Sequence, residues 1–89
     1  MSMNGRHRRT LDQIFAEPTP ASLRWNEIEA LFRALDAEIS EGAGSRVWVA
    51  LCGVRAVFHR PHPSPDTKRS SLRAVREFLI VAGIRPGEE

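Results

Sequence analysis

The chain has one cysteine, one lysine and no tyrosine, and it lacks any long apolar run. The lone Cys52 cannot form an internal disulfide and gives no paired-cysteine metal motif, so a disulfide-stabilised scaffold is excluded. The longest apolar stretch, residues 47–52, is far shorter than the roughly 20 residues that cross a bilayer. No apolar segment follows the basic start of the chain, so we expect no signal peptide and a cytoplasmic protein.

The 89 residues are 42% hydrophobic and 27% charged, a composition that is typical of one small globular domain. A chain of this length builds a single core, which excludes a large multi-domain enzyme. We expect residues 1–21 to be a basic leader with a short helical extension, and residues 22–89 to form the domain itself.

Positive charge is concentrated in one part of the chain. Twelve of the 13 basic residues are arginines. Residues 10–41 carry seven acidic side chains against Arg24 and Arg33, whereas residues 46–76 carry seven basic side chains against Asp66 alone. Such a basic half favours contact with phosphate or with an acidic partner, and the guanidinium fork matches phosphate in a bidentate manner.

Helical signals occur on both sides of the middle of the chain. Thr10 and Gln13 form a capping-box pattern that predicts a short helix over residues 10–15, preceded by a disordered leader. Apolar residues at helical spacing predict a helix over residues 24–36. Either Ser70 or Ser71 is expected to cap a last helix that runs to residue 82.

The hydrophobic period changes to two between these helices. Residues 37–41, 46–51 and 54–59 are expected to be three strands of an antiparallel meander, with turns at residues 42–45 and 52–53. Three prolines make residues 60–66 an extended loop. The predicted fold is therefore α+β: an α-β-β-β-α order with a three-stranded antiparallel sheet, helices on one face, and a short N-terminal helix.

The last predicted helix carries a ridge of arginines. Arg69, Arg73 and Arg76 lie within one narrow sector of the helical wheel, beside the buried stripe. One interpretation is a solvated face with Arg73 paired to Glu77. The other is a phosphate-binding ridge, reinforced by Lys68 and by the amides of the helix N-terminus.

Two histidines, His59 and His62, flank a proline on the loop that leaves the third predicted strand. The spacing of these histidines with Asp66 and Cys52 is not that of a metal site. The glycine-containing turn of residues 42–45 is not a dinucleotide-binding loop either, because a strand follows it instead of a helix. A histidine near arginines suits metal-free RNA cleavage, in which a general base deprotonates the 2′-hydroxyl and cations stabilise the phosphorane. The alternative is an exposed loop histidine without a catalytic role.

The order of several short motifs resembles the HicA toxins of bacterial toxin–antitoxin pairs. The likeness covers residues 22–84, and within it residues 25–32 match the first long helix of the family. The other matching motifs are Gly44-Ser45-Arg46, His59-Arg60-Pro61-His62-Pro63, Ser71-Leu72-Arg73-Ala74-Val75-Arg76 and Ala82-Gly83-Ile84.

The resemblance implies a fold like that of double-stranded RNA-binding domains. It also implies a metal-independent endoribonuclease that needs no cofactor, cuts messenger RNA and is silenced by a HicB-like antitoxin. The family usually places its catalytic histidine directly after the Gly-Ser turn, where this chain has Arg46. His62 is then the leading substitute, with Arg46 assisting and His59 or Ser45 as secondary participants.

Three functions remain open at this point. The first is a toxin ribonuclease, and the second is a catalytically silent RNA-binding or regulatory module that uses the same basic face. The third is a dock for an acidic protein. The predicted RNA-contacting residues are Arg46, Lys68, Arg69, Arg73 and Arg76.

Overall fold

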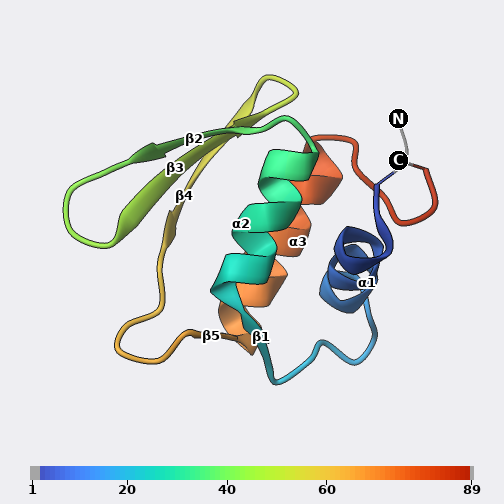
Figure 1. The fold of residues 1–89 in the computed structure, drawn as a ribbon, viewed down its shortest axis with the longest axis horizontal. Helices are drawn as coiled ribbons and strands as arrows, with labels where there is room; N and C mark the ends of the chain where they lie inside the picture. The colour runs from blue at the N-terminus through green and yellow to red at the C-terminus, as the bar shows by residue number, and fades with distance from the viewer. Residues whose placement is uncertain (1–2, 89) are drawn as a thin grey trace.

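Helices lie beside antiparallel strands in this α+β fold (Figure 1). A computed structural model describes residues 3–88. In this part of the chain three helices and five strands form. They are α1 (Gly5–Ile14), β1 (Ser22–Arg24), α2 (Trp25–Ala34), β2 (Glu38–Glu41), β3 (Arg46–Leu51), β4 (Val54–His59), β5 (Asp66–Lys68) and α3 (Arg69–Val81).

The predicted meander is confirmed as an antiparallel sheet with the strand order β2-β3-β4. The turn between β3 and β4 is formed by Cys52 and Gly53, whose φ angles are 51° and 79°. Two consecutive positive φ angles are those of the mirror-image turns that match the twist of a hairpin. This turn fixes the register, which pairs Arg46 at the start of β3 with His59 at the end of β4.

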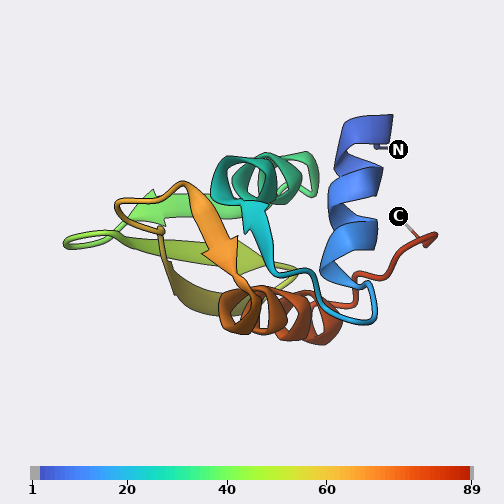
Figure 2. The same ribbon diagram turned by 90° about the horizontal axis from the view of Figure 1, so that it is seen from below.

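The two faces of the sheet differ in burial. Val47, Val49 and Phe58 point inward and are at most 8% exposed, whereas Trp48 and Val57 on the opposite face are 48% and 38% exposed. Figures 1 and 2 show α2 and α3 on the same side of the sheet. The predicted arrangement, with both long helices on one face of the sheet, is confirmed.

An aromatic cluster joins the helices to the sheet. Trp25 and Phe32 from α2, Phe58 from β4 and Phe78 from α3 form a chain of ring contacts with centroid separations between 5.6 and 6.3 Å. Edge-to-face pairs predominate, an arrangement that adds stability beyond the burial of apolar area. The end of β4, where His59 lies, is therefore held by a rigid core.

The N-terminal helix is longer than the sequence predicts. The disordered leader and the cap at Thr10 are wrong, because α1 begins at Gly5 and the Asn4 side chain accepts a hydrogen bond from the His7 amide at 3.0 Å. Thr10 lies in the middle of the helix, and its hydroxyl donates to the Arg6 carbonyl one turn earlier. The start of the predicted leader, residues 1 and 2, lies outside the described residues.

A two-stranded ladder that the sequence did not reveal lies beside the meander. β1 pairs with β5 in antiparallel register, which places Ser22 opposite Lys68. Residues 60–65 are loop as expected, but Asp66 already belongs to β5. The predicted serine cap of the last helix is wrong as well, because α3 begins at Arg69 after Lys68, and no side chain caps it.

Candidate functional site

The ends of β3 and β4 bring three predicted site residues together. Arg46 and His59 are direct cross-strand partners, and the Arg60 amide donates to the Ser45 carbonyl at 2.9 Å. Arg46 and His59 are both exposed and, by alternation with the buried Val47 and Phe58, lie on the outer face of the sheet. Side chains paired in this way have Cβ atoms about 5 Å apart. An imidazole and a guanidinium can therefore act on the same small group.

His62 lies on the loop that follows β4, and it shares a pocket with His59. This open pocket of about 290 Å³ is also lined by Lys68 and Ser71, from the start of α3. Both histidines are exposed. Two imidazoles, an ammonium group and a hydroxyl in one concave site can supply a base, an acid and a cation to one ligand.

The N-terminus of α3 borders this pocket. Lys68 occupies the N-cap position without a side-chain hydrogen bond to the helix. The first amides of a helix lack partners within the helix and attract anions. Thr67, which also lines the pocket, is 2% exposed, and its hydroxyl has no hydrogen-bond partner among residues 3–88. The site thus has unused donors beside a positive charge.

Arg60 holds the histidine-bearing loop against the body of the protein. Its guanidinium donates to Glu29 of α2 at 2.8 and 3.1 Å and to Glu41 of β2 at 2.5 and 2.7 Å. The hydrogen bonds from Arg60 lower the pKa of both carboxyls, and the two carboxylates raise the pKa of Arg60. Arg60 is therefore a structural tether between His59 and His62, a role that sequence reasoning missed.

The predicted arginine ridge of α3 does not act as one unit. Arg76 donates to the Ile14 and Ala16 carbonyls at 2.8 Å each, to the Thr19 hydroxyl at 3.0 Å, and pairs with Glu17. Its side chain is 18% exposed. Arg76 thus ties α3 to the segment that follows α1.

The other two arginines of the ridge are exposed. Arg69 donates from Nε to the Thr19 carbonyl at 3.0 Å. Arg73 has no ion pair with Glu77 or with any other residue in the part of the chain that the structure describes. Lys68, Arg69 and Arg73 therefore present cationic side chains along the first half of α3.

The described residues contain no group of three or more His, Cys, Asp or Glu side chains that could hold a metal ion. Cys52 is exposed at the β3–β4 turn, and His59 stands at the opposite end of β4. In the same range, no helix is both long and apolar enough to cross a membrane.

Comparison with known proteins identifies a family for this chain. The model of the family described as the HicA toxin of bacterial toxin–antitoxin matches residues 25–84. No curated protein and no solved structure matches the chain. The matched residues run from the start of α2 through α3, and so include the sheet, the loop with His62 and the pocket. Because the match covers well over half of the sequence, the chain belongs to the HicA toxin family of bacterial toxin–antitoxin modules.

Proposed function

We propose that the protein is a toxin ribonuclease that cleaves messenger RNA without a metal ion. The observation that carries the proposal is the pocket that His59 and His62 share with Lys68, at the uncapped N-terminus of α3. Two histidines supply the acid and the base that a phosphodiester cleavage needs. The lysine and the helix amides supply the positive environment for the reacting phosphate.

The RNA backbone binds along a basic surface around this pocket. Arg46 contributes to this surface as the cross-strand partner of His59, and Lys68, Arg69 and Arg73 extend the surface from the N-cap of α3 along the helix. These side chains are exposed. We assign Arg76 a supporting role, because its guanidinium is already engaged with the segment after α1.

The cleavage step is an attack of the 2′-hydroxyl on the adjacent phosphate. One imidazole takes the 2′-hydroxyl proton as the 2′-oxygen forms its bond to phosphorus. The other protonates the 5′-oxygen as the phosphorus–5′-oxygen bond breaks, which leaves a 2′,3′-cyclic phosphate and a free 5′-hydroxyl. Arg46 and Lys68 stabilise the additional negative charge on the phosphorane.

The strand register bears on the choice of base. The family likeness favours His62, whereas the register places His59 directly opposite Arg46, the position where the family usually has a histidine. An imidazole on β4 can thus serve the surface that a histidine on β3 would serve. We propose His59 and His62 as the base–acid pair, with Ser45 as a secondary participant at the same end of the hairpin.

A toxin of a toxin–antitoxin module has an antitoxin partner. We propose a HicB-like protein that binds over the basic pocket and blocks access of RNA. Carboxylates on that partner would complement Lys68, Arg73 and Arg46, which are the charges offered to RNA phosphates.

The test is cleavage of a messenger RNA by the purified protein with EDTA present throughout. We expect His59→Ala and His62→Ala each to slow cleavage by about 100- to 10,000-fold, the usual contribution of a general acid or base. His7→Gln, which alters a histidine outside the pocket, is the matched control and keeps wild-type activity. Thermal unfolding of each variant separates a chemical defect from a folding defect.

The second function is the silent RNA-binding module, which the presence of Arg46 favours. Arginine stays protonated at neutral pH and cannot act as a base. Wild-type protein that binds RNA but leaves it intact, and that does not arrest growth on induction, would support this function over the ribonuclease. Unchanged cleavage by both histidine variants would remove the proposed acid–base pair.

A further inference from the structure

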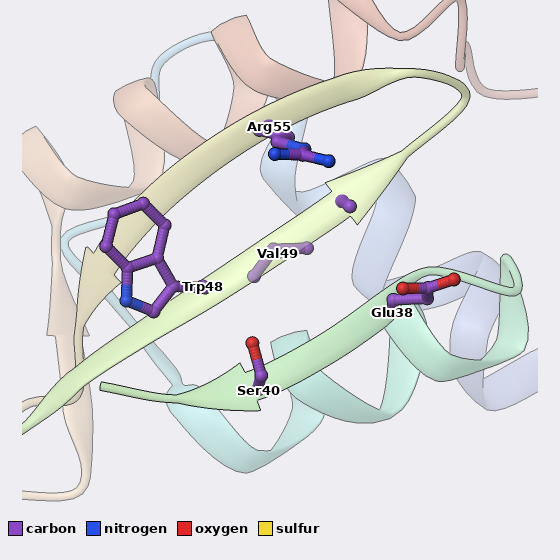
Figure 3. A pocket seen from close by; sticks show the side chains of 6 residues that line it. Glu38, Ser40, Trp48, Val49 and Arg55 are labelled. Carbon is purple, nitrogen blue, oxygen red and sulfur yellow. The ribbon is translucent and has the colours of Figure 1, made fainter.

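A second pocket lies on the outer face of the sheet, apart from the histidine pocket. It has a volume of about 260 Å³ and is lined by Glu38, Ser40, Trp48, Val49, Ala50 and Arg55 (Figure 3). The three strands of the meander all contribute to it. Within residues 3–88, no helix lies against this face (Figure 1).

Trp48 forms one wall of the second pocket. Its side chain is 48% exposed, which is unusual for the largest apolar side chain in a small domain. The indole lies against Gly42 in the turn before β3, where a Cβ would lie 2.9 Å from the Trp48 Nε1 and the ring would have to shift. The register sets Trp48 between Ser40 on β2 and Val57 on β4. The indole therefore lies at the surface, beside the hydroxyl of Ser40.

Opposite charges flank the floor of the pocket. Ala50 stands between Glu38 on β2 and Arg55 on β4 in one cross-strand row. Figure 3 shows Glu38 and Arg55 on opposite sides of the pocket. Neither has an ion-pair partner within residues 3–88, so an acceptor and a donor are both available. An aromatic wall, a small floor, an acceptor and a donor together match the groups on a planar nucleobase.

We propose that this pocket binds an unpaired base of the RNA, stacked on Trp48, with Glu38 accepting a hydrogen bond from an exocyclic amino group. The inference rests on the proposed function and specifies its substrate as single-stranded RNA. Aromatic side chains on sheet surfaces stack unpaired bases, and carboxylates accept from the cytosine amino group.

The position of Trp48 on β3 favours RNA over a protein as the occupant. Arg46 lies two residues away on the same face of β3, and Arg55 lies on the other side of the indole. A strand with one phosphate per nucleotide can contact both arginines while one base enters the pocket. Arg46 in turn pairs with His59, so the bound base lies close to the proposed cleavage site.

The experiment follows tryptophan fluorescence during titration with 2′-O-methyl oligoribonucleotides, which lack the attacking hydroxyl and are not cleaved. Trp25 is 5% exposed and reports little, so the expected quenching comes from Trp48. We expect Trp48→Ala to remove the quenching and to weaken binding about 5- to 150-fold, the value of one base–aromatic stack. Binding of the Ala and Phe variants is measured by electrophoretic mobility, and Trp48→Phe keeps most of the affinity.

Two further variants complete the test. Val57→Ala changes the exposed cross-strand neighbour of Trp48 and is expected to bind as the wild type does. Glu38→Gln is expected to reduce the preference for oligocytidine over oligouridine. If Trp48→Ala binds RNA as the wild type does while Lys68→Ala binds weakly, the base pocket is refuted and the proposed function stands. If the wild-type protein binds no RNA, the proposed function fails and the base pocket with it.

Discussion

Arg76 on α3 donates from Nε to the carbonyl of Ile14, the last residue of α1, at 2.8 Å. This contact joins the matched family domain to a helix that lies outside it. The Ile14 side chain is fully buried, so the hydrogen bond forms at the edge of the core. α1 is therefore part of the folded unit, although the family match begins only at residue 25.

Replacing Arg76 is expected to destabilise the protein. Arg76→Met leaves the Ile14 and Ala16 carbonyls without their donor, and hydrogen bonds to charged groups contribute about 1.5–3 kcal/mol each. A net loss of about 2 kcal/mol lowers the melting temperature of a domain of this size by roughly 8–16 °C. The measurement is thermal unfolding followed by circular dichroism. Arg73→Met, on the exposed side of the same helix, serves as the control and shifts stability by less than about 0.5 kcal/mol.

A substitution that creates a cavity beneath α1 tests whether this helix belongs to the core. Leu11 and Leu79 are both 0% exposed. Leu11→Ala and Leu79→Ala are therefore each expected to cost about 2–5 kcal/mol in urea unfolding. The partly buried Leu35 gives a smaller loss. A neutral result for Leu11→Ala would show that α1 is a dispensable leader.

The Arg60 tether predicts a loss of stability in acid. Hydrogen bonding to Arg60 holds the pKa of Glu29 below its ordinary value of 4.5. The stabilisation is complete above that value and is lost as the pH falls from 4.5 through the lowered pKa. We expect the free energy of unfolding of Glu29→Gln to fall less steeply with acid than that of the wild type.

The matched variant for the acid titration is Glu41→Gln. Glu41 binds the same guanidinium, but its side chain is 66% exposed, compared with 14% for Glu29. Exposed ion pairs contribute little to stability. Equal pH profiles for Glu29→Gln and the wild type would contradict a stabilising role of the tether.

RNA affinity is expected to depend on salt through the exposed cations of α3. Removing one phosphate contact with single-stranded RNA lowers the log–log salt slope by about 0.7. Arg73→Ala should show this decrease, and Arg69→Ala combined with Arg73→Ala a larger one. Arg85→Ala, which removes an exposed arginine beyond the other end of α3, leaves the slope unchanged. An unchanged salt slope in the double variant would show that Arg69 and Arg73 face solvent and do not contact RNA phosphates.

Growth arrest links these measurements to the toxin. Induced expression of the wild type is expected to stop growth, and co-expression of the antitoxin to restore it. His59→Ala combined with His62→Ala should permit growth while the soluble yield and melting temperature stay near those of the wild type. Full arrest by this double variant would show that toxicity does not depend on the pocket histidines.

The sequence predicts those parts of the fold that local pattern determines. The three strands of the meander, α2 and α3 all lie within about two residues of their expected bounds, because each has an amphipathic period over a full element. The start of α1 could not be found in this way, since residues 5–9 are polar and Asn4 competes with Thr10 as a capping signal. β1 and β5 have three residues each, too few to show a period.

The candidate site was predictable in its residue types and less so in its geometry. His59, His62 and Lys68 stand out in the sequence, and the structure brings them to one pocket. The roles of Arg60 and Arg76 depend on partners far away in the chain, such as Glu29 and Ile14, which no local pattern encodes. Alternation along β3 already sets Trp48 opposite Val47 and Val49, but the pocket beside it depends on neighbours from β2 and β4 that only the register supplies.

Because it depends on the β1–β5 ladder, the histidine pocket is expected to form late in folding. The β3–β4 hairpin closes through a two-residue turn, whereas Ser22 must find Lys68 across most of the domain. Contacts between distant residues cost more loop-closure entropy and form later than local ones. During synthesis β5 and α3 leave the ribosome after β4, so a chain that stops short of them carries His59 without the lysine and the helix terminus that complete the pocket. If this pocket is the proposed cleavage site, a growing chain gains the proposed activity only after β5 and α3 have joined the hairpin.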